Sequence, residues 1–418
     1  MKTNFVPRNV AGLAQETLSD TPITIISGAR QVGKSTLMGQ LIEDKHARVV
    51  NLDDLGDRNA AQADPDGFAA QFPEGILAVD EIQRVPELLT SLKANVDRDR
   101  RPGRFIATGS ANLLSLRGAH ESLAGRAETI QLEGFSQDEL EGRKADFVSF
   151  LWELPTRGQP PEQSDIDRRK YLQLAITPSF PEARRRTARS RDRWLRAYTE
   201  RLLTKDTTDI TGILYPDRLE TLLNVIAARN SSEFVAARIG RDIDIPARSI
   251  PAYLHALQSV FLTRSIPGWS NNIANRAVST PKVSLSDTGL AAHLAGVELD
   301  ALEAAISSTI TGGLLEGFVA GELAKQSTWS TRSTRMFHYR DDENREVDFI
   351  VEDRSRSIAG IEVKASSSPG HADFAGLRYL RDRVGDQFVA GVVLHTGQRA
   401  HSFGDRLWAL PLSTLWRN

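Results

Sequence analysis

Short, continuous apolar runs separated by polar segments dominate the first third of the chain. The four clearest runs cover residues 22–27, 49–52, 76–79 and 104–110. Continuous rather than alternating apolar positions are typical of strands buried on both faces, as in a parallel sheet. A helix is expected over residues 35–43, directly after the first run. The pattern therefore predicts an α/β domain with a parallel sheet over residues 1–142.

Strand-like runs become rare after about residue 140. Residues 143–212 are predicted to form a helical lid or linker, with a turn-rich segment at residues 158–162. Residues 213–302 have the pattern of a winged helix, in which helices precede a hairpin-like wing.

Three helices are expected in that winged-helix region. The first covers residues 222–227, and the second runs from Glu233 to Ile239, capped by Ser232. A third is expected after Ser249, followed by a hairpin-like run over residues 260–266.

The pattern becomes alternating near residue 346. Val347, Phe349 and Val351 are expected on one face of a strand, and Glu346 and Asp348 on the other. A polar turn over residues 352–357 precedes a second strand over residues 358–364, and a helix is expected over residues 314–325. These elements predict a second, smaller α/β domain over residues 303–418.

Composition narrows the functional classes. The 418 residues carry a formal net charge of −2, so no global basic field points to nucleic acid or to an anionic membrane. The absence of cysteine excludes disulfides, cysteine nucleophiles and thiolate metal sites. No apolar run reaches the length of a membrane span, and the first residues lack the apolar core of a signal peptide. A cytoplasmic protein without a membrane partner is expected.

The first apolar run is followed by Gly-Ala-Arg-Gln-Val-Gly-Lys-Ser at residues 28–35, which is the phosphate-binding P-loop pattern. Its backbone N–H groups and the following helix N-terminus favour phosphate, and Lys34 would reach the β- and γ-phosphates. The expected nucleotide-binding residues are Gly28, Ala29, Arg30, Gln31, Val32, Gly33, Lys34, Ser35 and Thr36. ATP with Mg²⁺ is the expected ligand.

Two carboxylates follow the third run. Asp80 is expected to hold Mg²⁺ together with the hydroxyl of Ser35, and Glu81 to orient and deprotonate the attacking water. Thr108 or Ser110, at the end of the fourth run, is expected to sense the γ-phosphate, because parallel strands present their carboxyl ends at one edge.

Asp53 and Asp54 point to the same edge of the predicted sheet. They either contribute to the nucleotide site or cap the next helix.

These motifs, with Ser-Leu-Ala-Gly-Arg at residues 122–126 and Phe-Pro-Glu at residues 180–182, resemble AAA-type ATPases of bacteria and archaea that carry a C-terminal domain of unknown function. The resemblance implies an arginine at the γ-phosphate, supplied by the same subunit or a neighbour. It favours Arg126, with Arg117 as a second candidate. An arginine acting from a neighbour would imply a homo-oligomer.

A second set of chemical residues lies near the C-terminus. Asp348, followed by Glu362 and Lys364, has the order of the PD-(D/E)XK nuclease superfamily, and Glu316 resembles its first acidic position. The three carboxylates would hold Mg²⁺ or Mn²⁺, and Lys364 would orient water or stabilise the phosphorus centre. This resemblance implies DNA as a partner, and Tyr339 and Arg340 could contact its backbone. The following helix departs from the superfamily pattern, since it offers only Arg378.

Two further features bear on nucleic acid. Residues 184–193 form the most basic stretch, which fits either a phosphate backbone or a solvated helix face. The winged-helix region offers few base-reading side chains, namely Arg248, Ser249, His255 and Gln258.

The leading hypothesis is an ATPase whose nucleotide state controls a C-terminal half that binds or cleaves DNA. The alternative is an ATP-dependent regulatory switch whose nuclease-like domain is inert and binds a protein partner. A kinase-like phosphotransferase is disfavoured, because the Asp80–Glu81 pair is typical of hydrolysis.

Overall fold

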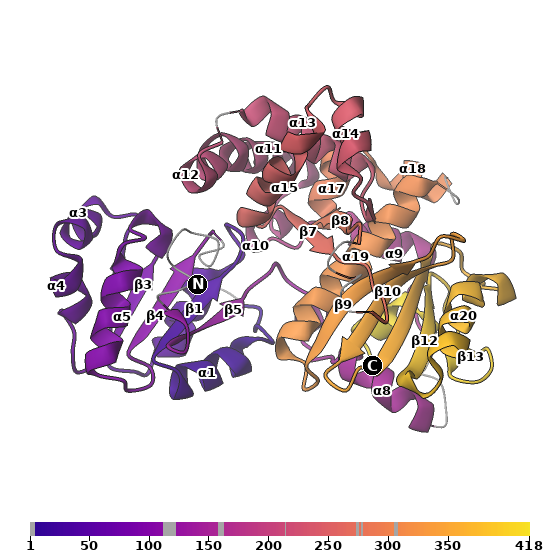
Figure 1. Cartoon of the computed structure of the whole chain (residues 1–418), viewed down its shortest axis with the longest axis horizontal. Helices are drawn as coiled ribbons and strands as arrows, with labels where there is room; N and C mark the ends of the chain where they lie inside the picture. The colour runs from indigo at the N-terminus through magenta and orange to yellow at the C-terminus, as the bar shows by residue number, and fades with distance from the viewer. Residues whose placement is uncertain are drawn as a thin grey trace.

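The computed structural model describes residues 5–111, 123–157, 163–213, 215–272, 276, 279–304 and 308–418. Arg117 and the predicted turn at residues 158–162 lie outside these ranges. Figure 1 shows the N-terminal sheet on one side, a helical part above, and the C-terminal sheet on the other side. Within the described residues, no helix combines the length and apolar character needed to cross a membrane.

The N-terminal sheet is parallel throughout. Its strand order is β2-β3-β4-β1-β5, so the P-loop strand β1 lies beside β4, and the predicted sensors Thr108 and Ser110 lie at the carboxyl end of β4. The strands are β1 (Ile23–Ser27), β2 (Ala47–Asn51), β3 (Ile76–Asp80), β4 (Phe105–Gly109) and β5 (Ala127–Gln131). This confirms the α/β fold with a parallel sheet that the apolar runs predicted.

Helices cover both faces of this sheet. Ile26 and Ile106 pack in one core cluster with residues of α1 (Ala11–Asp20) and α2 (Lys34–Ile42), whereas Ile25 belongs to the cluster on the other face. The second face is covered by α3 (Leu55–Ala63), α4 (Pro65–Ala70) and α5 (Leu88–Arg98). Burial on both faces explains the continuous apolar runs of the inner strands β1, β3 and β4, whereas the edge strand β2 leaves Val49 58% exposed.

The chain leaves β5 and reaches the C-terminal part before it returns to the middle. Helix α8 (Phe147–Glu153) packs against α19 (Thr309–Trp329), and α9 (Arg168–Ala175) also contacts α19. Residues 143–212, predicted as one helical lid or linker, therefore pack partly against the C-terminal part and partly against the middle part. The short helix α7 (Gln137–Leu140) lies where the chain enters the C-terminal part, and α10 (Pro181–Arg184) lies where it returns to the middle part. Helix α11 (Ala188–Arg201) then packs against α17 (Thr288–Leu294).

The middle part combines helices with a small antiparallel sheet of order β6-β8-β7. Its elements in chain order are α12 (Thr207–Thr211), α13 (Pro216–Ala228), β6 (Ser232–Glu233), α14 (Ala236–Asp242), α15 (Ile250–Ser259), β7 (Thr263–Ile266) and β8 (Lys282–Leu285). The expectation that Ser232 caps the second helix is wrong, because Ser232 pairs with Val283 in the sheet. The helix begins only at Ala236.

The C-terminal part is a mixed sheet of order β13-β14-β12-β11-β10-β9. Its strands are β9 (Thr334–Arg340), β10 (Glu346–Asp353), β11 (Ile358–Lys364), β12 (Phe388–His395), β13 (His401–Ser402) and β14 (Leu407–Pro411). Helix α19 packs on one face and α20 (Ala375–Val384) on the other. The short helix α18 (Leu299–Ala304) contacts α9.

One strand of this sheet departs from the predicted alternation. Val347 packs on the α20 side with Ile350, whereas Phe349 and Val351 pack on the α19 side. The pairing register with β9 shifts between Val347 and Ile350, as at a β-bulge. Val347 therefore does not share a face with Phe349, because the irregularity reverses the side-chain direction.

Candidate functional site

The P-loop lies between β1 and α2, at the carboxyl edge of the N-terminal sheet. A Cβ atom on Gly28 would lie 2.0 Å from the carbonyl oxygen of Leu132, so this close approach of two backbones requires glycine. Gly33 has a left-handed φ of 101° at the start of α2. Around the loop opens a cavity of about 630 Å³.

Lys34 is the buried cation of this loop. Its Nζ donates to the carbonyl oxygen of Ala29, 2.9 Å away. Burial lowers the pKa of Lys34 to about 8, although the nearby carboxylates of Glu81 and Asp80 oppose the shift.

Asp80 joins three elements at the sheet edge. Its Oδ1 accepts a hydrogen bond from Ser35 Oγ of α2 at 3.0 Å and another from Thr108 Oγ1 of β4. Thr108 Oγ1 in turn accepts the backbone N–H of Glu81 at 3.1 Å. The predicted magnesium ligands Ser35 and Asp80 therefore lie in contact, and an oxygen pair of this kind suits Mg²⁺.

Glu81 follows β3 in a left-handed conformation, with φ of 57°. Its carboxylate accepts hydrogen bonds from Ser110 Oγ at 3.0 Å and from Gln83 Nε2. Gln83 Nε2 also lies 2.8 Å from Ser110 Oγ. A non-glycine residue held at positive φ stores strain of about 1–3 kcal/mol, which is common where a side chain is aimed at a reaction. Sequence reasoning assigned no role to Gln83, because its contact with Ser110 joins segments 27 positions apart.

Asp53 and Asp54, the other acidic residues at this edge, have different contacts. Asp54 caps α3 by accepting the N–H groups of Gly56 and Asp57. Asp53 lines the cavity and pairs with Arg84 at 2.8 Å.

Arg30 ties the P-loop to the middle helices. Its guanidinium makes a two-pronged contact with Asp206, which includes a 2.9 Å bond to Oδ1. Asp206 ends a π-helical turn over Leu202–Asp206. Tyr198 Oη donates to the carbonyl oxygen of Arg30 at 3.3 Å.

The basic stretch at residues 184–193 begins at the nucleotide cavity. Arg184 and Arg185 line it together with Glu182 and Pro181. Their position offers cations close to the P-loop, a role that sequence reasoning did not assign to them.

Arg126 lies at the opposite edge of the sheet. Its carbonyl accepts the N–H of Ile23 at the start of β1, and its side chain pairs with Asp97 at 2.5 Å. Because the P-loop follows the other end of β1, Arg126 does not reach phosphates bound to its own chain. A contact from the same subunit is therefore wrong for Arg126, and only a contact from a neighbouring copy stays a prediction.

Residues 133–139, which we term the junction, connect the N-terminal part to the C-terminal part. Arg8 donates to the P-loop carbonyl of Val32 at 2.9 Å and to the junction carbonyl of Glu133 at 2.7 Å. Its Nε also pairs with the buried carboxylate of Glu139 at 3.1 Å.

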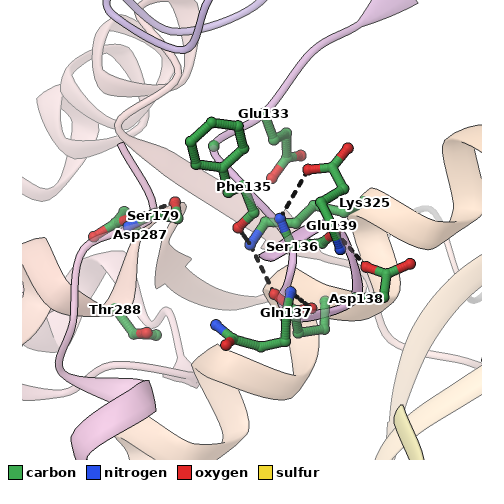
Figure 2. Close-up of polar contacts among 12 residues, drawn as sticks. Glu133, Phe135, Ser136, Gln137, Asp138, Glu139, Ser179, Asp287, Thr288 and Lys325 are labelled. Atoms are coloured by element: carbon green, nitrogen blue, oxygen red, sulfur yellow. Dashed lines mark hydrogen bonds and ion pairs between the residues drawn. The ribbon is translucent and has the colours of Figure 1, made fainter. Parts of the chain in front are cut away.

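The junction is equally tied to α19. Lys325 Nζ donates to the carbonyl oxygen of Phe135 at 3.0 Å, as Figure 2 shows. Glu322 accepts the N–H of Gln137 at 2.8 Å. Burial raises the pKa of Glu322, which the charge of Lys325 opposes.

A third contact joins the junction to the middle part. Glu133 pairs with Arg264 of β7, with an Nη2–Oε1 distance of 2.6 Å. Nearby, Ser179 Oγ donates to Asp287 Oδ2 at 2.6 Å, and Ser179 accepts the N–H of Phe135 through its carbonyl (Figure 2).

The C-terminal carboxylates gather at one end of β10 and β11. Asp348 and Glu362 are both buried, and Lys364 Nζ lies 2.8 Å from Glu362 Oε2. Asp348 Oδ2 accepts the N–H of Val363 at 3.0 Å. Burial and the charge of Asp348 raise the pKa of Glu362 well above its usual range.

A lysine from the middle part enters this cluster. Lys282 Nζ lies 3.0 Å from Asp348 Oδ1 and 3.3 Å from Glu316 Oε2. Burial and the charge of Asp348 raise the pKa of Glu316 to about 8. Across the ranges that the structure describes, no group of three or more His, Cys, Asp or Glu residues is placed to hold a metal ion. The metal site predicted at Glu316, Asp348 and Glu362 is therefore not assembled, because an ammonium group lies between two of its carboxylates.

Three of the side chains expected to contact DNA, those of Tyr339, Arg340 and Gln258, are engaged within the chain. Tyr339 is buried and donates to Asp341, and Arg340 pairs with Glu233 at 3.3 Å. Gln258 donates to Ser265.

Comparison with known proteins adds to this geometry. Residues 20–141 match the family model described as an AAA domain. The matched segment contains the parallel sheet, the P-loop and the Ser35–Asp80 contact. This segment is therefore similar to an AAA-type P-loop ATPase domain. The rest of the chain matches two domains of unknown function, DUF8612 at residues 168–301 and DUF4143 at residues 311–415.

Relatives match this chain over nearly its whole length. An uncharacterized protein of Mycobacterium tuberculosis is 26% identical over 408 residues, which cover 97% of this chain and 83% of the relative. A Walker-type ATPase of Pyrococcus abyssi is similar in structure, with 15% identity and a TM-score of 0.43 over 70% of this chain and 97% of that chain. A mutant RuvB of Thermotoga maritima follows, with 18% identity and a TM-score of 0.28 over 62% and 88% of the two chains.

Proposed function

We propose that the AAA domain hydrolyses ATP and that the chain is an ATP-dependent switch. The observation that carries the proposal is the position of Glu81, whose carboxylate is held by Ser110 and Gln83 next to Asp80. A carboxylate at this place can orient a water molecule against the γ-phosphate and accept its proton.

The other residues fit the same reaction. The P-loop N–H groups and Lys34 bind the phosphates, and Thr108 keeps Asp80 in place through its hydroxyl. Ser35 and Asp80 would hold Mg²⁺, which would neutralise charge on the phosphate oxygens. Arg184 and Arg185 supply cations from the same chain, and Arg126 would act on a neighbouring copy in a homo-oligomer.

Steady-state hydrolysis tests this proposal. Purified protein with Mg²⁺ and ATP should release phosphate, and Glu81→Gln should lower kcat by about 10²-fold or more while nucleotide still binds. Lys34→Ala should weaken both binding and turnover. The exposed Glu87 provides a matched control, since Glu87→Gln removes a charge outside the cavity. Hydrolysis that survives both Lys34→Ala and Glu81→Gln would sink the assignment.

The switch part of the proposal rests on the junction. Arg8 contacts the P-loop and the junction at the same time, and the junction in turn contacts Lys325 and Glu322 of α19. A change of the P-loop on nucleotide binding would thus alter contacts of the C-terminal part. We favour a switch in which this change controls the binding of a protein partner to the C-terminal part.

Cleavage of DNA is a second candidate. It is favoured by the placement of Asp348, Glu362 and Lys364 on adjacent strands beside α19, with Glu316 facing them. The ammonium group of Lys282 weighs against it. Incubation of single- and double-stranded DNA with Mg²⁺ or Mn²⁺, with and without ATP, tests it. Cleavage lost in Asp348→Ala would support a nuclease, and intact DNA under every condition would reject one.

A further inference from the structure

Lys282 is the first residue of β8, the central strand of the small antiparallel sheet. It pairs with Glu233 of β6 and with Ile266 of β7. The residue is only 8% exposed, and its ammonium group projects into the carboxylate cluster of the C-terminal part. The cation in the cluster therefore comes from a different part of the chain than the carboxylates.

The ammonium group bridges two carboxylates from separate elements. Glu316 belongs to α19 and Asp348 to β10, and Lys282 is within 3.3 Å of an oxygen of each. A buried carboxylate without a partner is strongly unfavourable, so such a cluster requires a cation. Lys364 pairs with Glu362 and cannot serve both of the others.

The strand that carries Lys282 is fixed to the edge of the C-terminal sheet. The carbonyl oxygen of Thr280, two residues earlier, accepts a hydrogen bond from His338 Nε2 at 2.9 Å. His338 also bonds through its backbone to Pro267 and to Trp269. These contacts hold the backbone that carries Lys282 against β9, beside the carboxylate cluster.

We propose that Lys282 takes the place of a divalent cation, so that the carboxylate cluster is a metal-excluding ionic link between the middle and C-terminal parts. The chemistry that makes Glu316 and Asp348 suitable for a hard cation is satisfied internally. This inference does not depend on the ATPase proposal, since it uses no residue of the nucleotide site.

Binding of Mn²⁺ without nucleotide tests the link, measured by electron paramagnetic resonance and calorimetry in a Ser35→Ala background that removes a P-loop ligand. In the protein that keeps Lys282, Asp348→Asn should leave Mn²⁺ binding unchanged, because the cluster holds no Mn²⁺. Lys282→Met keeps most of the length of the side chain but removes its charge. It should gain a Mn²⁺ site that binds at least about tenfold more tightly than any Mn²⁺ binding by the unaltered cluster, and Asp348→Asn should remove that site again. Lys282→Arg is the matched control and should gain none.

Each outcome decides the matter. A Mn²⁺ site that depends on Asp348 in the presence of Lys282 would overturn the proposal. So would a folded Lys282→Met protein that binds no Mn²⁺. If Lys282→Met folds only when Mn²⁺ is added, the metal has replaced the lysine and the proposal is supported. If it stays unfolded in Mn²⁺ while Lys282→Arg is native, exchange of lysine for metal is rejected.

Discussion

The guanidinium group of Arg8 donates a hydrogen bond to the carbonyl oxygen of Val32, 2.9 Å away inside the phosphate-binding loop. The same side chain pairs with Glu139, which is buried at the end of the junction. One residue near the N-terminus thus contacts both the loop that binds phosphate and the segment that leads away from it.

Arg8→Ala should therefore destabilise the protein. It leaves the buried carboxylate of Glu139 without its cation, at a cost of about 3 kcal/mol, and frees the carbonyl of Val32. We expect a lower midpoint of thermal unfolding and weaker nucleotide binding. The exposed Arg48 is the control, and Arg48→Ala should change neither. Equal midpoints for the two variants would contradict the assigned role of Arg8.

Ser110→Ala should lower kcat for ATP hydrolysis by about tenfold and leave KM nearly unchanged. The hydroxyl group positions Glu81 and does not bind the nucleotide in this account. Gln83→Ala should act in the same direction, since Gln83 holds the same carboxylate. Gln62→Ala, on the exposed face of α3, is the comparison that should retain full turnover. A rise in KM without loss of kcat would show that Ser110 serves binding instead.

Nucleotide binding should take up a proton near pH 8.5. Burial lowers the pKa of Lys34 to about 8, so at pH 8.5 roughly a quarter of the free protein carries a charged Lys34. Bound phosphates favour the ammonium form, so binding should take up about 0.7 proton at pH 8.5 and far less at pH 7. Calorimetry in buffers of different ionisation enthalpy measures this uptake. An uptake that does not fall from pH 8.5 to pH 7, or that persists in Lys34→Met, would contradict the assignment to Lys34.

Arg126 should act on a neighbouring copy. Neither Arg126→Ala nor Lys34→Ala alone should hydrolyse ATP well, but a mixture should regain activity, because Arg126 of the second variant can face the intact P-loop of the first. Hydrolysis should also rise more steeply than protein concentration as copies assemble. A mixture no more active than the sum of its parts would assign the γ-phosphate contact to Arg184 or Arg185.

The sequence best predicted those features that depend on residues close together along the chain. The P-loop, Asp80 and Glu81 follow strands whose apolar runs are continuous, so strand, loop and carboxylate could be placed from local patterns. Asp348 and Glu362 were placed near each other for the same reason, since a short turn joins their strands.

The parts that it did not predict depend on contacts between distant segments. Lys282 and Asp348 are 66 positions apart, and nothing in the sequence near Lys282 marks it as the partner of a carboxylate. Arg8 and Glu139 are 131 apart. The reversed direction of Val347 arises from an irregular pairing with β9, which local alternation does not reveal. The position of Arg126 followed only once residues 127–131 were seen to form β5, parallel to β1, because Arg126 then lies at the end opposite the P-loop.

The measurement that tests the switch most directly is hydrogen exchange with and without a non-hydrolysable ATP analogue. We predict that the analogue slows exchange in the P-loop, in the junction at residues 133–139 and in α19. In Arg8→Ala the protection should remain at the P-loop and disappear from the junction and α19, and in Lys34→Ala it should be weak everywhere. Protection confined to the P-loop in the unaltered protein would contradict a switch that connects the nucleotide site to the C-terminal part.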